Sequence, residues 1–206
     1  MKKRDVFELK IDPDQNLEVG VISLVSDPAV NYNYLTFSKQ EKPKKYEFAK
    51  GADQYEIFGV AMVPDVLIPR YDKVKDEEFD VVFSKETIRQ IAQNFFLKNY
   101  HHKINIEHSN IFINATTWQS YIVDSKIGVN APTAFGDVPD GSWIVGLKLD
   151  ETDSATMKAW EGIKDGTIFK GFSIEGFFAD LLLGTVLKDE EDDSVDGLIK
   201  DLLDLL

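Results

Sequence analysis

One serine near the end of the chain lies inside an apolar run and is a candidate nucleophile. The run is Gly171–Gly176, with the sequence GFSIEG, so Ser173 stands between two glycines. A buried hydroxyl is costly without a hydrogen-bond partner. Glycines also allow a second backbone, such as that of a peptide, to approach closely. Because a serine needs a base to remove its proton, the run predicts acyl-transfer chemistry if a base lies nearby.

His108 is the histidine best placed to be that base. It ends an alternating stretch that begins at Ile104, so it shares one face of a predicted strand with the isoleucines. The other two histidines, His101 and His102, lie at the end of a predicted helix, where an imidazolium favours the helix C-terminus. A strand-borne Ser173 and a strand-end His108 are the minimum parts of an acyl-transfer site.

A catalytic triad also needs a third group that orients the imidazole. Glu175 is our first choice, because it is two residues from Ser173 and a pleated strand puts both on the same face. Asp124 and Asp180 remain alternatives that the sequence does not rank, whereas Glu107 alternates away from the histidine. Taken singly, each of these residues also fits a structural role, such as a strand hydroxyl bonded to a carbonyl or a charge on an exposed face.

The sequence contains no recognisable metal or nucleotide motif. A zinc site would compete for His108, together with Glu107 and the pair of His101 and His102, but HExxH and similar spacings are absent. The glycine-rich motifs GxxxxGK[ST] and GxGxxG are also absent. The chain has no cysteine, which excludes a thiol nucleophile, a disulfide framework and cysteine metal sites. We therefore expect neither a metal nor a cofactor.

The composition of the 206 residues is that of a globular protein, with 43% hydrophobic and 12% aromatic residues. A net charge of -13 without a basic stripe argues against binding of nucleic acid. No run approaches the roughly 18 apolar residues of a membrane span, and no apolar signal core follows the basic N-terminus. We expect a soluble, intracellular protein that contacts neither nucleic acid nor a membrane.

The elements that must position these residues are many strands and two helices. Apolar and β-branched runs predict the strands, and apolar spacing after the N-cap Ser84 predicts the first helix. A loop is predicted between Pro64 and Pro69. Strands are predicted at 19–25, 55–63, 79–83, 101–106, 118–123, 143–149 and 169–178, and helices at 87–100 and 154–164. This pattern predicts an α+β fold with a mostly antiparallel, β-barrel-like core flanked by helices.

We divide the chain into three parts. Residues 1–50 form an N-terminal strand segment and a lysine-rich linker, 51–187 form the main domain, and 188–206 form an acidic tail. The tail holds eight acidic residues against two lysines, and its leucine spacing fits a short amphipathic helix. Such a tail is either a docking segment for a partner helix or a charged, unstructured end.

The order of these motifs resembles the prohead maturation proteases of tailed bacteriophages, in particular their phage serine protease group. It is similar at greater distance to the herpesvirus assemblin fold. The resemblance covers roughly residues 17–180 and includes ISLVSDPA at 22–29, NIEH at 105–108, PDGSW at 139–143 and GFSIEG at 171–176. The pairing of GFSIEG with an upstream histidine is its most specific part.

The resemblance implies a seven-stranded barrel-like core in which Ser173 is the nucleophile and His108 the general base. It makes residues 51–187 a protease domain that needs no cofactor. The third catalytic member is matched less well. The group has an acidic residue before Ser-Trp, where this chain has Gln119 followed by Ser-Tyr, so Glu175 remains the candidate.

The resemblance further implies a protease enclosed in the assembling prohead, in the host cytoplasm. Its substrates would be the phage scaffold and major capsid proteins, with self-cleavage in the linker or the tail. It would act as a homodimer or a higher oligomer. Two other interpretations stay open. A non-catalytic capsid-assembly or scaffold-core protein could keep the same fold, which the departure at Gln119 favours. An unrelated esterase is disfavoured because the chain has no GxSxG elbow.

Overall fold

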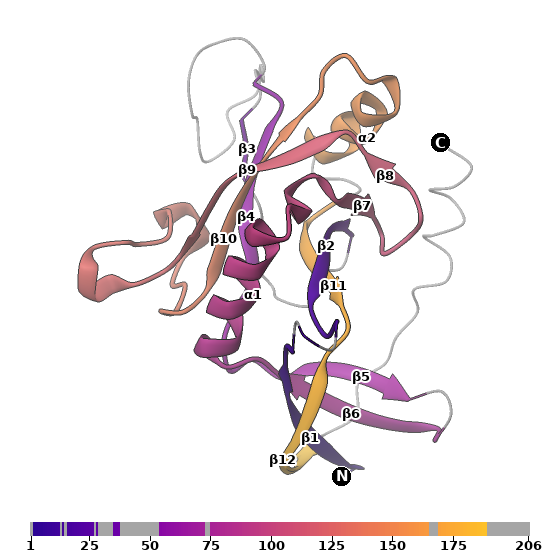
Figure 1. The fold of residues 1–206 in the computed structure, drawn as a ribbon, viewed down its shortest axis with the longest axis vertical. Helices are drawn as coiled ribbons and strands as arrows, with labels where there is room; N and C mark the ends of the chain where they lie inside the picture. The colour runs from indigo at the N-terminus through magenta and orange to yellow at the C-terminus, as the bar shows by residue number, and fades with distance from the viewer. Residues whose placement is uncertain are drawn as a thin grey trace.

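The structure is a computed structural model that describes residues 2–12, 14, 16–26, 28, 35–37, 54–72, 75–164 and 169–188. These ranges contain twelve strands and two α-helices (Figure 1). The strands are β1 (Lys2–Lys10), β2 (Val19–Val25), β3 (Leu35–Phe37), β4 (Glu56–Met62), β5 (Ile68–Asp72), β6 (Glu77–Val82), β7 (Ile104–Ile106), β8 (Phe112–Ile113), β9 (Ala115–Ile122), β10 (Trp143–Leu149), β11 (Gly171–Gly176) and β12 (Ala179–Lys188). The helices are α1 (Lys85–Leu97) and α2 (Ser154–Lys164), with short 3-10 helices η2 (Tyr100–His102), η3 (Ser125–Ile127) and η4 (Thr133–Phe135).

The strands form three four-stranded sheets. Their orders are β12-β1-β6-β5, β3-β4-β10-β9 and β11-β2-β7-β8. Neighbouring strands are antiparallel except in the pairs β1–β6 and β2–β7. The predicted α+β class is therefore confirmed, but the predicted barrel-like core is not. The described strands form no closed barrel, because β11 and β4 approach each other without becoming hydrogen-bonded neighbours.

Helix α1 follows the predicted pattern closely. The Ser84 hydroxyl accepts a hydrogen bond from the Thr87 backbone N–H, 3.3 Å away, and so caps the helix. Ile88, Ile91 and Phe95 are spaced to bury one side of the helix, and each is at most 1% exposed. The helix ends at Leu97, earlier than predicted, because the chain turns into a left-handed conformation at Asn99 before η2 begins.

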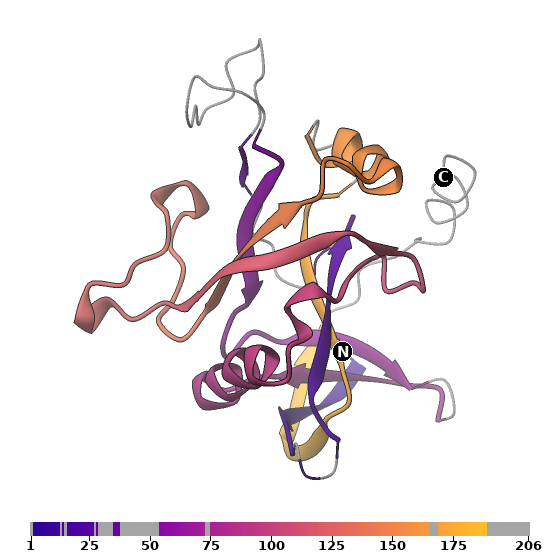
Figure 2. The same ribbon diagram turned by 45° about the horizontal axis from the view of Figure 1, so that its top comes forward.

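Helix α1 lies between two of the sheets, as two views of the ribbon show (Figures 1 and 2). It contacts β2 of one sheet and β9 and β10 of the other. Its Phe95 packs edge-on against Trp143 of β10, with ring centroids 5.5 Å apart, and both side chains are fully buried. This packing holds the sheet that contains the candidate residues against the rest of the core.

The sheet β11-β2-β7-β8 brings together the predicted serine strand and the predicted histidine strand, with β2 between them. In its register Ser173 lies opposite Ser23 of β2, and Ser23 is paired with Asn105 of β7. Strands β1 and β2 from the first 50 residues thus pair with strands of the predicted main domain. The division at residue 50 stays a prediction, and the linker at 38–50 and the tail from 189 lie outside the described residues.

Five of the described strands, β1, β3, β5, β8 and β12, lie outside the strand ranges predicted from the sequence. Strands β1 and β12 pair with each other along their length, and β1 is also parallel to β6. Strand β5 contains Pro69, within a stretch predicted to be a loop. Proline is tolerated there because β5 is an edge strand, whose outward side needs no backbone donor.

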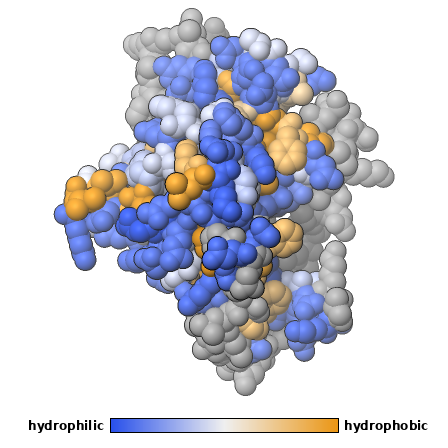
Figure 3. Space-filling view, viewed as in Figure 1, coloured by the Kyte–Doolittle hydropathy of each residue, from blue (hydrophilic) through white to orange (hydrophobic). Residues whose placement is uncertain are grey.

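The face of the molecule seen in Figure 3 is mostly hydrophilic, and its hydrophobic residues lie in a few small groups. Of the large apolar side chains in the described ranges, Phe177, Leu97 and Ile127 are the most exposed, at 76%, 79% and 74%. Within the same ranges, no helix is both long enough and apolar enough to cross a bilayer.

Candidate active site

Four polar side chains meet on one face of the β11-β2-β7 sheet. Glu175 Oε1 lies 3.2 Å from His108 Nδ1, 2.6 Å from Ser23 Oγ and 2.6 Å from Asn105 Nδ2. Ser23 Oγ is also 2.6 Å from Asn105 Oδ1 and 3.1 Å from His108 Nδ1. The four residues therefore form one hydrogen-bonded network, and a single carboxylate oxygen is its centre.

The pleat of the strands explains why these residues meet. Ile22 and Leu24 are fully buried in the hydrophobic core, so Ser23 between them faces the opposite side of β2. Asn105 is its partner on the parallel strand β7, and Glu175 lies diagonally across the antiparallel strand β11. Three neighbouring strands thus each contribute one polar side chain to the same face.

His108 reaches the network from a strained turn after β7. Glu107 and His108 both have positive φ angles, 49° and 52°, and Ser109 N–H donates to the Ile106 carbonyl at 2.9 Å. Two successive positive φ angles closed by this bond are the pattern of a type I′ turn, which normally favours Asn-Gly. Non-glycine residues in sparsely populated backbone regions cost about 1–3 kcal/mol each and persist only where surrounding contacts hold them.

The contacts that hold this turn come from Glu107. Its backbone N–H donates to the Leu24 carbonyl at 2.9 Å, and its carboxylate accepts the Ser26 N–H at 2.5 Å. The side chain therefore points to the end of β2, away from the imidazole. The predicted alternation was wrong for His108, because β7 ends at Ile106 and the turn puts the imidazole on the face of Asn105, opposite the core face of the two isoleucines. Both bonds anchor the turn to β2, so that the next residue, His108, faces Glu175.

The contacts also decide the direction of the hydrogen bonds. An ionised carboxylate only accepts, so His108 Nδ1 donates its proton toward Glu175 Oε1 and Ser23 Oγ. In the neutral imidazole the other ring nitrogen, Nε2, is then unprotonated and can accept a proton. Asn105 donates one amide hydrogen to Glu175 and the other to the Ser109 carbonyl, 2.7 Å away. A carboxylate that orients an imidazole in this way is the arrangement of a general base.

Ser173 lies beside this network without being bonded to it. It is directly opposite Ser23 in the register, which places the two Cβ atoms about 4.5–5.5 Å apart. Its side chain is 9% exposed and lines a cleft, whereas Ser23 is fully buried. No hydrogen bond joins Ser173 to His108 among the described residues. The structure thus brings His108 and Glu175 into contact and places Ser173 next to Ser23, which contacts both of them.

Of the other two candidates for an orienting acid, Asp124 has a described side chain, and no hydrogen bond or ion pair joins it to His108 in the described ranges. Asp124 pairs with Val129 in an isolated bridge beside η3, outside the sheet of the network. Asp180 lies on β12 opposite Leu9, and its side chain is outside the described part of the structure. Gln119 lies on β9 in a different sheet, opposite Gly146 of β10.

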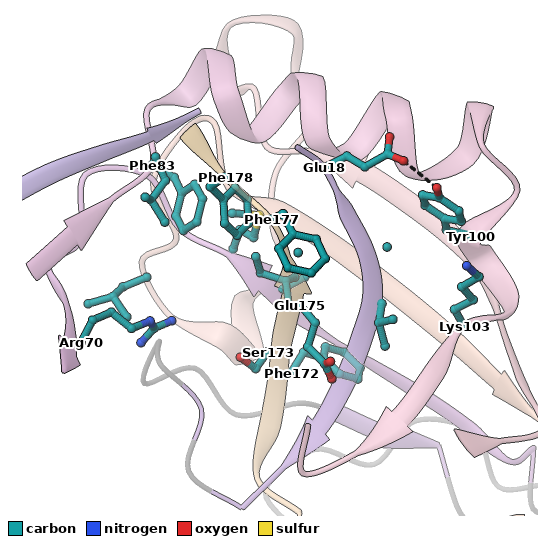
Figure 4. A pocket seen from close by; sticks show the side chains of 18 of the residues that line it. Glu18, Arg70, Phe83, Tyr100, Lys103, Phe172, Ser173, Glu175, Phe177 and Phe178 are labelled. Carbon is teal, nitrogen blue, oxygen red and sulfur yellow. Dashed lines mark hydrogen bonds between the residues drawn. The ribbon is translucent and has the colours of Figure 1, made fainter. Parts of the chain in front are cut away.

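A cleft of about 710 Å³ runs beside β11, and Figure 4 shows the side chains around it. Ser173 and Glu175 line it in the middle, while Phe177 and Phe178 lie at the end of the strand (Figure 4). Because β11 is an edge strand of its sheet, the cleft lies along unpaired backbone. Its volume and its mixture of apolar walls and polar groups suit a peptide segment.

The charged groups of the cleft are held in different ways. Glu18 accepts hydrogen bonds from Tyr100 at 2.6 Å and Asn94 at 2.9 Å, and the bond from Tyr100 raises the pKa of this phenol. The Lys103 ammonium lies 4.4 Å from the centre of the Tyr100 ring. Burial lowers the pKa of Arg70, whose guanidinium lies on the other side of β11 (Figure 4). No group of three or more potential metal ligands occurs in the described ranges.

Ser23 and Asn105 are the members of the site that the sequence analysis missed. Each stands between apolar residues that alternate toward the core, as Ser173 does in its own strand. The asparagine is even part of the NIEH motif that was compared with the phage proteases. What the sequence does not contain is the order of the strands, which alone brings residues 23, 105 and 175 together.

The sequence also matches a known family. A family model described as "Putative phage serine protease XkdF" matches residues 45–181, about two thirds of the chain. The matched range includes His108, Ser173 and Glu175, but it begins after β2 and so does not include Ser23. No curated protein and no solved structure matches the chain.

Proposed function

Because the chain belongs to the putative phage serine protease XkdF family, we propose that it is a serine endopeptidase with Ser173 as nucleophile, His108 as general base and Glu175 as the acid that orients the base. The observation that carries this proposal is the contact of 3.2 Å between Glu175 Oε1 and His108 Nδ1, beside a cleft that Ser173 lines. It leaves Nε2 as the proton acceptor, which is the role that acyl transfer requires.

The proposed reaction follows from these positions. His108 Nε2 removes the Ser173 hydroxyl proton while Ser173 Oγ attacks the peptide carbonyl, forming a tetrahedral intermediate. His108 then gives the proton to the departing amine, and water attacks the acyl-enzyme with His108 again as base. The proposal requires Nε2 of His108 and Oγ of Ser173 to come within hydrogen-bond distance when substrate binds, as catalytic contacts often tighten in the complex.

Ser173, rather than Ser23, is the proposed nucleophile. Ser23 has the shorter distance to His108, but it is fully buried and already bonded within the network. A peptide carbonyl cannot reach such a hydroxyl unless the side chains that surround it move. Ser173 lines the cleft and has a side chain outside the network, so its oxygen is accessible from the side where a peptide would lie.

The biological substrates that we propose are the phage scaffold and major capsid proteins, processed inside the assembling prohead in the host cytoplasm. The support is the phage serine protease family and the motif order that resembles prohead maturation proteases. Self-cleavage, a homodimer or higher oligomer, and a distant relation to the herpesvirus assemblin fold belong to the same proposal.

A second candidate is a non-catalytic assembly protein with the same fold. Two observations favour it, namely the absence of a hydrogen bond between Ser173 and His108 and the replacement of an expected acid by Gln119. Under this interpretation the polar network only fills the face of the sheet, and the cleft binds a capsid or scaffold segment without cleaving it.

Co-expression with the cognate scaffold and capsid proteins distinguishes the two candidates. We expect processed products with the wild type and none with Ser173→Ala or His108→Ala. Ser142→Ala is the matched control, because Ser142 is fully buried and its hydroxyl has no hydrogen-bond partner in the described ranges. Processing that continues in the Ser173→Ala variant would eliminate the endopeptidase proposal in this form. Binding without processing in the wild type would support the assembly protein.

A further inference from the structure

We propose that Ser23 and Asn105 are positioning residues of this site, which hold the Glu175 carboxylate against His108. This inference rests on the proposed function. It adds two residues that neither touch the substrate nor transfer a proton. Ser23 lies outside the range that the family match covers.

Burial is the first argument. Ser23 is 0% exposed and Asn105 is 1% exposed, although buried polar side chains are costly unless their hydrogen bonds are satisfied. The backbone pairing of β2 with β7 and β11 requires neither a hydroxyl nor an amide at these positions. The buried pair of Ser23 and Asn105 therefore has a role other than strand pairing. Its contacts with Glu175 indicate what that role is.

The second argument is convergence. Ser23, Asn105 and His108 all direct a polar hydrogen at the same atom, Glu175 Oε1, at 2.6, 2.6 and 3.2 Å. The Ser23 hydroxyl has only one proton, which it shares between this oxygen and Asn105 Oδ1. A carboxylate that accepts several fixed donors keeps one orientation.

The third argument is the link to the turn that contains His108. The second amide hydrogen of Asn105 is donated to the Ser109 carbonyl at 2.7 Å, immediately after the histidine. Asn105 therefore connects the carboxylate and the imidazole-bearing turn through one rigid side chain. Glu175 is 32% exposed, so without this pair its flexible side chain would be free to turn to solvent.

The test is a set of double-mutant cycles. Ser23→Ala and Asn105→Asp are each made in the wild type and in Glu175→Gln, with kcat and KM measured on a peptide spanning a cleavage site mapped by co-expression. In the wild-type background we expect kcat to fall by about 10- to 100-fold with KM unchanged, as is usual when an outer hydrogen-bond partner is removed. In the Glu175→Gln background the same changes should cost less than about twofold. Equal losses in both backgrounds would overturn the inference.

Imidazole NMR supplies a measurement that does not depend on turnover. The chain has only three histidines, so the His108 ring signals can be assigned with a His108→Ala variant. We expect Nδ1 to be protonated in the wild type and the protonation to move toward Nε2 in Ser23→Ala and Asn105→Asp. An unchanged tautomer in folded variants would refute the positioning role. Ser142→Ala should leave the tautomer unchanged, and a tautomer change there would equally refute the specific role of Ser23.

The same experiment distinguishes a failure of folding, a failure of the proposed function and a failure of the present inference. Asn105→Asp keeps the size of the side chain, removes the amide donor and adds a second carboxylate beside Glu175. Both effects should release Glu175 from His108, so this variant tests the inference if Ser23→Ala does not fold. Failure of the proposed function appears as activity that survives Ser173→Ala. Failure of the present inference appears as additive losses or an unchanged tautomer, while Ser173→Ala is still inactive.

Discussion

Glu175 and His108 reach their contact from opposite sides of β2, since Glu175 belongs to β11 and His108 follows β7. The contact of 3.2 Å between Oε1 and Nδ1 therefore joins a side chain of β11 to a side chain of the turn after β7. The central strand β2 comes from the first 25 residues of the chain. Any change that shifts β2 relative to either neighbour must alter this contact.

Removal of the Glu107 carboxylate should loosen the turn that contains His108. Glu107→Ala loses the bond from the Ser26 N–H, and the two positive φ angles are then held less firmly. We expect the free energy of unfolding to fall by about 1–3 kcal/mol, the usual range for a hydrogen bond to a charged group, and kcat to fall with it. Denaturant unfolding measures the first effect. Glu151→Ala, at a half-exposed surface position, should change stability by less than about 0.5 kcal/mol.

Gly176 should not tolerate a side chain. A Cβ there would lie 2.8 Å from Val19 Cα and would also meet the Glu18 carbonyl, and both neighbours are backbone. Gly176→Ala should therefore force β11 away from β2, at a cost of about 1–3 kcal/mol, and reduce activity. Thermal melting and peptide cleavage test this. Gly20→Ala is the control on the facing strand, because its Cβ would meet nothing nearer than Tyr100 Cε2 at 3.9 Å. Equal destabilisation by both changes would contradict the prediction.

The raised pKa of Tyr100 predicts a loss of stability at high pH. Its hydrogen bond to Glu18 raises its pKa above the ordinary 10.0, so the folded state favours the protonated phenol. The stabilisation is fully present below the unfolded pKa and is lost as the pH rises through the raised folded value. Unfolding of the wild type and Tyr100→Phe should therefore differ at pH 8, with the wild type more stable. The difference should shrink as the phenol ionises, and a difference that grows with pH would contradict this assignment.

Phe177 should contribute to peptide binding but not to the chemical step. Phe177 is 76% exposed and lines the cleft. Exposed aromatic rings beside a binding site are common contact residues. Phe177→Ala should raise KM several-fold, leave kcat unchanged and change stability by less than about 0.5 kcal/mol. Ile127→Ala, which removes an equally exposed apolar side chain on η3 outside the cleft, should leave KM unchanged. A fall in kcat without a change in KM would place Phe177 elsewhere in the mechanism.

The α-helices and seven of the twelve described strands could be predicted because their signals are local, whereas the two longest strands, β1 and β12, were missed. The cap at Ser84 and the spacing of Ile88, Ile91 and Phe95 are readable over a few turns, and α1 forms where they indicate. Strand β5 was missed because Pro69 is ordinarily a strand breaker, and only its place at a sheet edge makes it acceptable. The tail and the linker lie outside the described residues, so the predictions about them stay as they were.

The amino-acid sequence by itself determined which chemical groups the chain possesses and which of them alternate to one side of a strand, because both are properties of neighbouring residues. Ser173 and Glu175 were recognisable on that basis, whereas His108 reaches their side of the sheet only through the turn after β7. Only the tertiary structure decided that β2 lies between β11 and β7, and hence that Ser23 and Asn105 meet Glu175. Strand order depends on the packing of whole sheets around α1, which no local pattern of residues encodes.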